Sequence, residues 1–306
     1  MAAQLAWIGL GNMGRGMCKN LIEKGNLSKP LIIYNRTRKR ADDLSATTGG
    51  QTAVAATIAE AVARADIIFT CVGDDKAIAD TLAQAVAGPA RVRGKLFVDC
   101  STVHPDTTAQ LAKVCNAQGA EFVAMPVFGA PAMADNGQLV CVLAGPAAAV
   151  DKVRPYTTGV VGRAVIDFSG QPQSKATLLK IIGNTFILNM VETLAQGHAL
   201  AEKSGLGVDN LQQFIETMFP GPYFAYSKRM STGDYYKREE PLFAVDLARK
   251  DAKHALAIAK ASGTSLRNME VADSHLEAVQ KHMGSKGDIA GIYGAVRQES
   301  GLPFEV

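Results

Sequence analysis

The feature that most constrains the fold of this chain is a glycine-rich segment close to its start. An apolar run at 4–8 precedes this segment, and a helical pattern over 14–23 follows it. The segment itself reads Gly9, Leu10, Gly11, Asn12, Met13 and Gly14. A strand, a G-x-G-x-x-G turn and a helix in this order are typical of a dinucleotide-binding unit. Such glycines permit a tight turn, a close approach of the backbone to a pyrophosphate, and close packing of helix on strand.

The residues after the next apolar run indicate which dinucleotide is bound. A strand is predicted at 31–34, and it is followed by Asn35, Arg36 and Thr37. A site for NAD usually has an acidic residue here, which accepts hydrogen bonds from the ribose 2′-hydroxyl. This chain has none, and Arg36 would suit the 2′-phosphate of NADP. We therefore expect NADP(H) as the cofactor; the alternative is a solvated basic turn.

Strands and helices continue to alternate through the first half of the chain. Further strands are predicted at 67–72, 95–99, 121–124, 139–144 and 164–168, and helices at 38–46, 57–64, 75–86 and 105–117. This alternation predicts a doubly wound α/β domain of Rossmann type over residues 1–169. Ligands in such sheets bind beyond the carboxyl ends of the strands, where we expect Val72, Ser101 and Thr102. An N-cap or turn role before the helix that begins at 105 is an equal alternative for the two hydroxyls.

After Gly170 the pattern is helical to the end of the chain. One long helix is predicted over about 172–204, and shorter ones at 208–219, 223–231, 241–262, 264–283 and 288–300. The long helix is apolar nearly all round, which indicates burial in a larger core or between subunits. We therefore expect residues 170–306 to form an all-α substrate and dimerisation domain, joined to the first domain by the long helix, in a homodimer.

Two polar residues lie within the apolar part of that long helix. Lys180 and Asn184 are four positions apart, so their side chains lie on the same helix face. Lysine is among the residues least often buried, so Lys180 either reaches water or takes part in chemistry. These two residues alone favour the water-facing interpretation.

Composition argues against several kinds of partner. A net charge of +3 over 306 residues is too small to indicate a nucleic-acid partner. The five cysteines form no C-x-x-C pair and fall mostly in apolar runs, which favours buried free thiols over disulfides or a metal site. Neither a signal peptide nor a membrane span is recognised. We expect a cytoplasmic protein without a metal and without a membrane partner.

Several motifs follow one another along nearly the whole chain. They are the glycine motif at 9–14, Asp99-Cys100-Ser101-Thr102 followed by Pro105, Pro126-Val127 with Gly129, Lys180 with Asn184, Lys250-Asp251, and Asp288-Ile289-Ala290. Together they resemble the β-hydroxyacid dehydrogenases, which include 3-hydroxyisobutyrate dehydrogenase and the glyoxylate/succinic semialdehyde reductases. The first half also resembles the NADP-binding domain of 6-phosphogluconate dehydrogenase.

The resemblance implies a fold and a set of roles. It implies a Rossmann-type domain joined by a long helix to a helical domain, with the active site in the cleft between them. Lys180 matches the family's catalytic lysine, and Asn184 matches the asparagine that holds the substrate oxygen. Thr102 and Lys250 match positions that contact the cofactor near the nicotinamide. Substrate contacts are expected from Ser101, Phe128, Gly129, Ala130 and Asp251.

The substrate loop departs from the family's pattern. The usual Asp-Ala-Pro-Val-Ser-Gly-Gly is Ala-Met-Pro-Val-Phe-Gly-Ala at 124–130. Phe128 thus replaces a serine that helps to grip the substrate carboxylate, and Ala130 replaces the last glycine. The lost hydroxyl and the added apolar bulk favour a more hydrophobic carbonyl compound over a short hydroxy acid.

The function expected from these observations is an NADP(H)-dependent oxidoreductase. It would interconvert a β-hydroxyacid or related alcohol and its semialdehyde or ketone, with Lys180 as general acid and base and Asn184 orienting the oxygen. One alternative is an NADPH-dependent imine reductase or reductive aminase, which Phe128 favours and Lys180 opposes. Another is a catalytically silent oligomerisation module, which the retained Lys180, Asn184 and glycine motif oppose.

Overall fold

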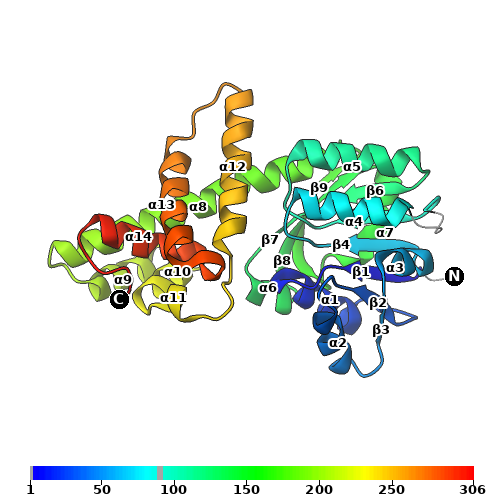
Figure 1. Cartoon of the computed structure of the whole chain (residues 1–306), viewed down its shortest axis with the longest axis horizontal. Helices are drawn as coiled ribbons and strands as arrows, with labels where there is room; N and C mark the ends of the chain where they lie inside the picture. Colours follow the sequence, from blue (N-terminus) through cyan, green and yellow to red (C-terminus); the bar gives the residue numbers. More distant parts are fainter. Residues whose placement is uncertain (1–2, 88–91) are drawn as a thin grey trace. The chain divides into compact units, whose positions relative to one another are not determined.

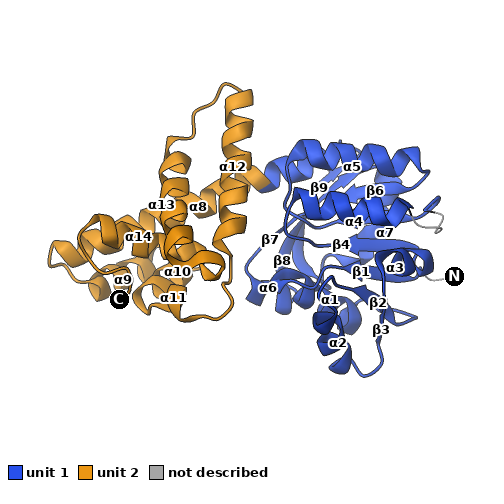
Figure 2. Ribbon diagram, in the orientation of Figure 1, with its two compact units in different colours: residues 1–180 blue, residues 181–306 orange. Residues whose placement is uncertain are grey.

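The computed structural model describes residues 3–87 and 92–306. The chain forms two compact units, residues 1–180 and 181–306 (Figure 2). The division falls inside one continuous helix, α8 (Ser174–Lys203), whose first turns pack in the first unit. A domain boundary at 169/170 remains our proposal, because it counts the whole of that helix with the helical part.

A nine-stranded mixed sheet forms the centre of the first unit, with helices on both of its faces (Figure 1). Its strand order is β3-β2-β1-β4-β5-β6-β8-β7, and β9 pairs with β8. The strands from β3 to β6 are parallel, as in a Rossmann-type sheet, whereas β8 runs antiparallel to both β6 and β7. The strands are β1 (Leu5–Ile8), β2 (Leu31–Tyr34), β3 (Thr52–Val54), β4 (Ile67–Thr70), β5 (Leu96–Asp99), β6 (Glu121–Ala124), β7 (Val127–Phe128), β8 (Leu139–Gly145) and β9 (Gly162–Ser169).

Alternation along the strands explains why this sheet is covered on both faces. In β1, Leu5 and Trp7 belong to one apolar cluster, and Ala6 and Ile8 belong to another. Successive side chains of a strand point to opposite faces, so a strand that is apolar throughout needs two layers of helices. Those layers are made from α1 (Asn12–Lys24), α2 (Arg38–Ala46), α3 (Ile58–Arg64), α4 (Asp75–Ala87), α5 (Pro105–Ala117), α6 (Pro131–Asp135), α7 (Ala147–Val153) and the 3₁₀ turn η1 (Arg154–Tyr156).

The Rossmann-type fold predicted from the sequence is confirmed, and the elements that sequence analysis missed are short. These are β3 and β7, with three and two residues, and α6 and α7, with five and seven. An element of this length presents too few side chains for its periodicity to be recognised. One of them, β7, carries Phe128.

The second unit consists of helices around its own apolar cluster. Across 181–306, all of which the structure describes, the only bridge of the β type joins Ala244 to Asp288. The predicted all-α fold of this part is therefore confirmed, although α11 was not predicted. After α8 the elements are α9 (Val208–Met218), α10 (Pro222–Ser231), α11 (Asp234–Lys237), α12 (Val245–Ala261), α13 (Arg267–Met283), η2 (Gly284–Lys286), η3 (Ile289–Gly291) and α14 (Ile292–Glu299).

The long helix α8 is buried along one side and exposed along the other. Leu188, Val191 and Ala195 are fully buried, whereas Phe186 is 73% exposed. Among the described helices, α8 alone is long and apolar enough to cross a membrane, judged by length and composition. Half of its most apolar window is nevertheless buried within the protein, as in the core helix of a globular protein.

Candidate active site

The turn after β1 has a backbone that only glycine suits. Gly9 has a φ of 103°, and a Cβ atom there would lie 2.2 Å from the carbonyl oxygen of Cys71. The indole of Trp7 donates a hydrogen bond to the Gly9 carbonyl at 2.8 Å, which holds the turn from the buried side. A side chain at position 9 would therefore displace the segment that follows β4.

The next two glycines of the motif serve different purposes. Gly11 precedes the first residue of α1, and a Cβ atom there would have no atom within 4 Å. Its lack of a side chain is therefore unrelated to packing in the protein and leaves space beside the helix start. At Gly14, by contrast, a Cβ atom would lie 2.2 Å from the Gly9 carbonyl oxygen, so this glycine allows α1 to pack against the turn.

The start of α1 fits a pyrophosphate. Its first turn contains no acidic residue, and Gly11 contributes no side-chain cap. The first N–H groups of a helix lack acceptors within the helix, and they attract anions together with the helix dipole. Arg15, which sequence analysis missed, adds a positive charge in this turn and donates to Asn12 Oδ1 at 2.9 Å. Its place directly after the glycine motif was the available signal.

The end of β2 combines an ordered asparagine with an exposed arginine. Asn35 Oδ1 accepts from the Leu10 N–H at 2.9 Å, and its amide donates to the Thr37 carbonyl at 2.9 Å. Asn35 therefore ties this segment to the glycine turn. Arg36 is exposed and has no ion-pair partner in the part of the chain that the structure describes. The cations that follow in α2 are paired: Arg38 with Asp42 at 3.4 Å, and Lys39 with Asp43 at 2.7 Å.

Beyond β4 and β5, the Ser101 hydroxyl is engaged within the first unit. It donates to Asp99 Oδ1 at 2.7 Å and accepts from the Val72 N–H at 3.0 Å. Asp99 also accepts from Thr70 at 2.7 Å, and burial raises the pKa of its carboxyl group. Ser101 thus links two strand ends, and its contact with substrate remains a prediction.

The helix that follows is not capped by either of the hydroxyls that could have capped it. The residue before α5 is His104, whose Nδ1 accepts from the Asp106 N–H at 3.2 Å. The N-cap role expected as an alternative for Ser101 and Thr102 is therefore wrong, whereas Ser101 does have a turn role through its bond to Asp99. Thr102 is half-buried, and a contact with the cofactor remains our proposal for it.

The loop after β6 brings Phe128 to Lys180. Phe128 ends β7 and pairs with Val140 of β8, and the ammonium Nζ of Lys180 lies 4.5 Å from the centre of its ring. Gly129 follows with a φ of 143°, and a Cβ atom there would lie 2.6 Å from the Leu139 side chain. The exposed Ala130 then precedes α6.

Lys180 does not face water. Its side chain is 8% exposed, so the water-facing interpretation that the two residues alone favoured is wrong. Apolar side chains precede and follow it along α8, and the Phe128 ring is one of its contacts. A buried lysine is costly unless its charge is compensated or used, which makes Lys180 the strongest candidate for chemistry in the chain.

In the helical unit, Asn184 is held by an acidic residue from α12. Its amide Nδ2 donates to Asp251 Oδ2 at 2.7 Å, and both side chains are buried. The Lys250 ammonium lies 3.3 Å from the other carboxylate oxygen, Asp251 Oδ1. Sequence analysis placed these residues in one site but did not foresee that Asp251 fixes the orientation of Asn184.

The predicted residues thus form local groups. The glycine turn joins Asn35 and the start of α1, Phe128 lies against Lys180, and Asn184 joins Asp251 and Lys250. Among the described residues, no group of three histidines, cysteines, aspartates or glutamates could hold a metal ion. All five cysteines are free, and burial raises the pKa of the Cys141 thiol to about 12.

Comparison with known proteins identifies the family. A family model for the NAD binding domain of 6-phosphogluconate dehydrogenase matches residues 4–167. The chain is 40% identical over 293 residues to the NADH-dependent oxidoreductase ucdB of Aspergillus ustus, covering 95% of this chain and 98% of that protein. The chain belongs to the β-hydroxyacid dehydrogenase family.

Solved structures with the same fold include members of that family. A 3-hydroxyisobutyrate dehydrogenase from Salmonella typhimurium has a TM-score of 0.83 at 21% identity, covering 95% of this chain and 99% of that one. A reductive aminase from Aspergillus terreus, in complex with NADPH4, cyclohexanone and allyl amine, has a TM-score of 0.59 at 21% identity, covering 95% and 98%. At this identity, both show the fold alone.

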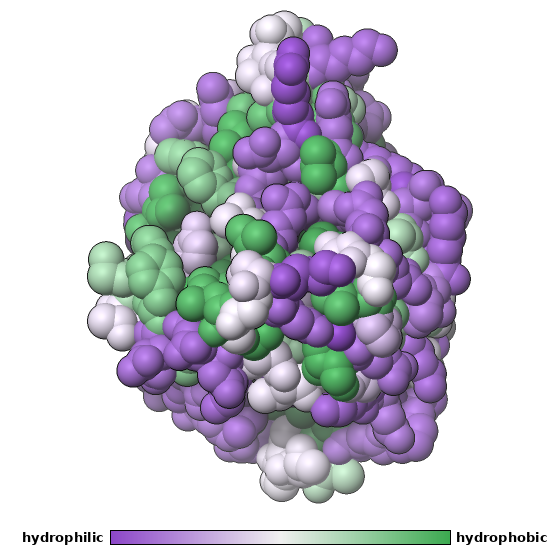
Figure 3. All heavy atoms as spheres, turned by 90° about the vertical axis from the view of Figure 1, so that its left-hand side faces the viewer, coloured by the Kyte–Doolittle hydropathy of each residue, from purple (hydrophilic) through white to green (hydrophobic). Residues whose placement is uncertain are grey.

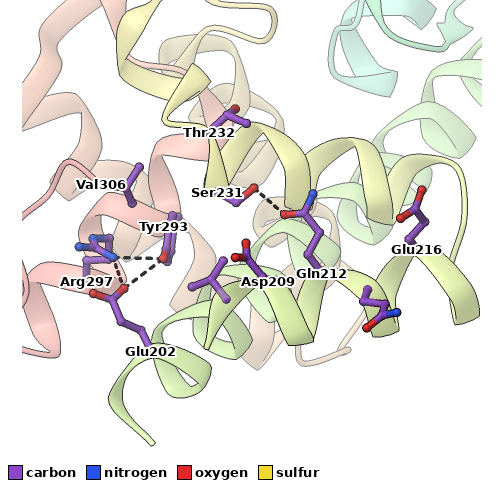
Figure 4. Close-up of a pocket in the computed structure, with 11 residues that line it drawn as sticks. Glu202, Asp209, Gln212, Glu216, Ser231, Thr232, Tyr293, Arg297 and Val306 are labelled. Atoms are coloured by element: carbon purple, nitrogen blue, oxygen red, sulfur yellow. Dashed lines mark hydrogen bonds and ion pairs between the residues drawn. The ribbon is translucent and has the colours of Figure 1, made fainter. Parts of the chain in front are cut away.

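The helical unit also has a cavity of about 590 Å³ (Figure 4). Arg297 pairs there with Glu202 and lies beside the Tyr293 hydroxyl, and Ser231 donates to Gln212 at 2.6 Å. None of the predicted site residues lines this cavity. It is therefore separate from the residues to which chemistry is assigned.

Proposed function

We propose that this β-hydroxyacid dehydrogenase reduces a carbonyl compound with NADPH and oxidises the corresponding β-hydroxyacid or alcohol in reverse. The observation that carries the proposal is a lysine, Lys180, buried one helical turn from the buried Asn184. A buried amine that can gain and lose a proton is what hydride transfer to a carbonyl requires from the protein.

Each of these residues has a distinct part in the reaction. The protonated Lys180 donates a proton to the carbonyl oxygen during reduction, and the neutral amine accepts it back during oxidation. Asn184 positions that oxygen, and Asp251 holds the Asn184 amide in one orientation. When bound, the nicotinamide supplies or accepts the hydride.

The first unit offers the cofactor a matching set of groups. The glycine turn and the start of α1 would hold the pyrophosphate, because Gly11 leaves open space beside exposed N–H groups. We assign the 2′-phosphate to Arg36, which is exposed and has no ion-pair partner among residues 3–87 and 92–306. The family pattern assigns nicotinamide contacts to Thr102 and to Lys250. The name of the Aspergillus ustus relative, NADH-dependent, stands against the preference for NADP.

Imine reduction is the second candidate function. The apolar face of Phe128 at Lys180 favours it, because a hydrophobic ketone and its imine would suit the same surface. Lys180 favours the carbonyl reaction, because an oxyanion needs a proton in the transition state and an iminium ion does not. The silent-module alternative leaves unexplained why Lys180 is kept buried at all.

We also propose a homodimer, because the helical unit exposes a connected apolar surface. Phe214, Phe219 and Tyr223 are exposed and in ring contact, with centroids 5.8 and 5.3 Å apart along the series, and Met218 is 59% exposed. Figure 3 shows the face on which apolar patches lie between polar side chains. Connected apolar patches of this kind mark protein interaction sites. The proposal includes a cytoplasmic location, without nucleic-acid or membrane partners.

A screen of NADPH oxidation tests the proposed function. Semialdehydes, glyoxylate and hydrophobic ketones are each offered with and without a primary amine. We expect turnover without amine, and in Phe128→Ser a gain for glyoxylate relative to the ketones. Turnover that requires the amine would establish imine reduction instead. Binding of NADPH without turnover of any compound would favour the silent module.

A further inference from the structure

The contact between Phe128 and Lys180 favours one protonation state of the lysine. The face of an aromatic ring carries partial negative charge and attracts an ammonium ion, but it offers little to a neutral amine. The Lys180 Nζ atom lies 4.5 Å from the ring centre, within the range of a cation–π contact. Because Lys180 is 8% exposed, water screens this attraction weakly.

The position of the ring is fixed by the fold of the first unit. Phe128 pairs with Val140 in the antiparallel ladder between β7 and β8, and like Leu179 it packs against an apolar cluster of the first unit. Gly129 continues the chain with a φ of 143° against the Leu139 side chain. The aromatic ring is therefore held in place before any substrate arrives.

We propose that Phe128 is a positioning residue that keeps Lys180 in its ammonium form and thereby favours reduction over oxidation. Burial alone favours the neutral amine, and the ring opposes this. The phenyl ring attracts the ammonium ion and offers little to the neutral amine. This inference rests on the proposed function and adds a preferred direction to it.

The favoured reaction balances as follows. The carbonyl carbon gains a hydride as the reduced nicotinamide is oxidised, and the carbonyl π bond breaks. The oxygen takes a proton from Lys180 Nζ, so a C–H and an O–H bond form and an N–H bond breaks. The neutral amine then regains a proton from water. Oxidation of the alcohol would instead have to begin from the neutral amine, which the ring does not stabilise.

The pKa of Lys180 can be measured without turnover or cofactor. The full chain is labelled with acetic anhydride between pH 6 and 11, and mass spectrometry gives the labelling rate of each lysine. Lys175, which is exposed on the same helix, provides an internal reference. The variant Phe128→Leu removes the ring but keeps apolar bulk, whereas Phe128→Tyr keeps the ring face. Circular dichroism checks that both variants fold.

We expect Phe128→Leu to lower the pKa of Lys180 by about one unit, so that the neutral fraction near neutral pH rises roughly tenfold. Phe128→Tyr should stay close to wild type. In Phe128→Leu the alkaline limb of the pH profile of kcat for reduction should move to lower pH by the same amount. The kcat for oxidation should rise relative to the kcat for reduction. An unchanged pKa of Lys180 in Phe128→Leu would overturn the inference.

The labelling experiment and the substrate screen test the role of Phe128 and the proposed function independently. If the pKa of Lys180 falls in Phe128→Leu but no carbonyl compound is reduced, the proposed function fails while the effect of the ring on the lysine stands. If carbonyl compounds are reduced and the pKa does not change, only the role of Phe128 fails. A fall in Phe128→Tyr equal to that in Phe128→Leu would attribute the effect to packing and overturn the role of the ring.

Discussion

The two units of this chain differ in whether backbone or side-chain groups form their notable features. In the first unit, the features that fit a cofactor belong to the backbone: a turn with positive φ, a glycine beside open space, and the start of a helix. The buried charged side chains described there are Asp99 and Lys180. In the helical unit, Glu192, Asp251, Asp288 and Arg297 are all buried, in addition to two histidines.

These buried charges join helices that are far apart in the sequence. His275 of α13 contacts Glu192 of α8 at 2.9 Å and Glu299 of α14 at 3.1 Å, and Arg297 pairs with Glu202. The glycine turn of the first unit should keep its shape through most side-chain substitutions, but not through substitution of its glycines. The stability of the helical unit should instead depend on pH, because its buried side chains are ionisable. The comparison therefore predicts where each unit is vulnerable.

The largest effect is expected at Lys180, the buried side chain to which we assign the proton transfer. Lys180→Ala should lower kcat about 10²- to 10⁴-fold, because the proton donor is lost, and should leave NADPH affinity unchanged. Lys175→Ala, at an exposed position on the same helix, should keep wild-type turnover. Steady-state kinetics and calorimetric titration measure the two quantities. A loss of NADPH binding in Lys180→Ala would break the division between a backbone that binds and a side chain that reacts.

The second prediction compares one glycine from each unit. Gly9→Ala should reduce the free energy of unfolding by about 4 kcal/mol, because the new methyl group would lie 2.2 Å from a backbone oxygen. Gly205→Ala, in the helical unit, also has a positive φ of 79° but open space around it, and should cost about 1 kcal/mol. Urea denaturation measures both. Equal losses of unfolding free energy in the two variants would show that the positive φ alone decides the loss. The close packing around Gly9 would then have no additional effect.

The third prediction concerns the pH dependence of the helical unit. Burial lowers the pKa of His198 to about 4 from its usual value near 6.5. The unfolded chain therefore takes up a proton near pH 6.5 that the folded chain refuses until about pH 4, so stability falls as the pH falls between these values. The loss attributable to His198 at pH 4 is roughly 3 kcal/mol.

His198→Gln should remove that part of the pH dependence, because glutamine cannot take up the proton. Denaturation in urea at several pH values measures the slope. His275 acts in the opposite sense: its hydrogen bond to Glu192 raises the pKa of the imidazole, so its contribution is present below pH 6.5 and is lost as the pH rises through the raised pKa. An unchanged slope in His198→Gln would show that His198 does not account for the acid sensitivity of the helical unit.

The smallest effect is expected at Arg36, the side chain that we propose distinguishes NADPH from NADH. Arg36→Ala should weaken NADPH binding about tenfold, the value of one lost charge-assisted contact, and change NADH binding little. Lys39→Ala removes a nearby cation that is already paired with Asp43 and should alter neither affinity. Tighter binding of NADH than NADPH by the unaltered protein would contradict the assignment of Arg36.

The sequence predicted the parts of this molecule that depend on local order. The glycine turn, the Rossmann-type sheet and the long helix are each encoded within a few adjacent turns or strands, so their patterns could be recognised. The burial of Lys180 could not, because one of its contacts, the Phe128 ring, comes from β7, a two-residue strand some fifty positions earlier in the chain. The bond from Asn184 to Asp251 joins residues 67 positions apart, and no spacing within one helix indicates it.

The continuity of α8 sets a length that the rest of the chain cannot alter. Four residues of helix separate Lys180 from Asn184 by about 6 Å along the axis, and the division between the compact units falls between them. The interval between Lys180 and Asn184 is therefore set within α8 itself, so substitutions at Phe128 or Asp251 can alter the surroundings of each residue without altering that interval.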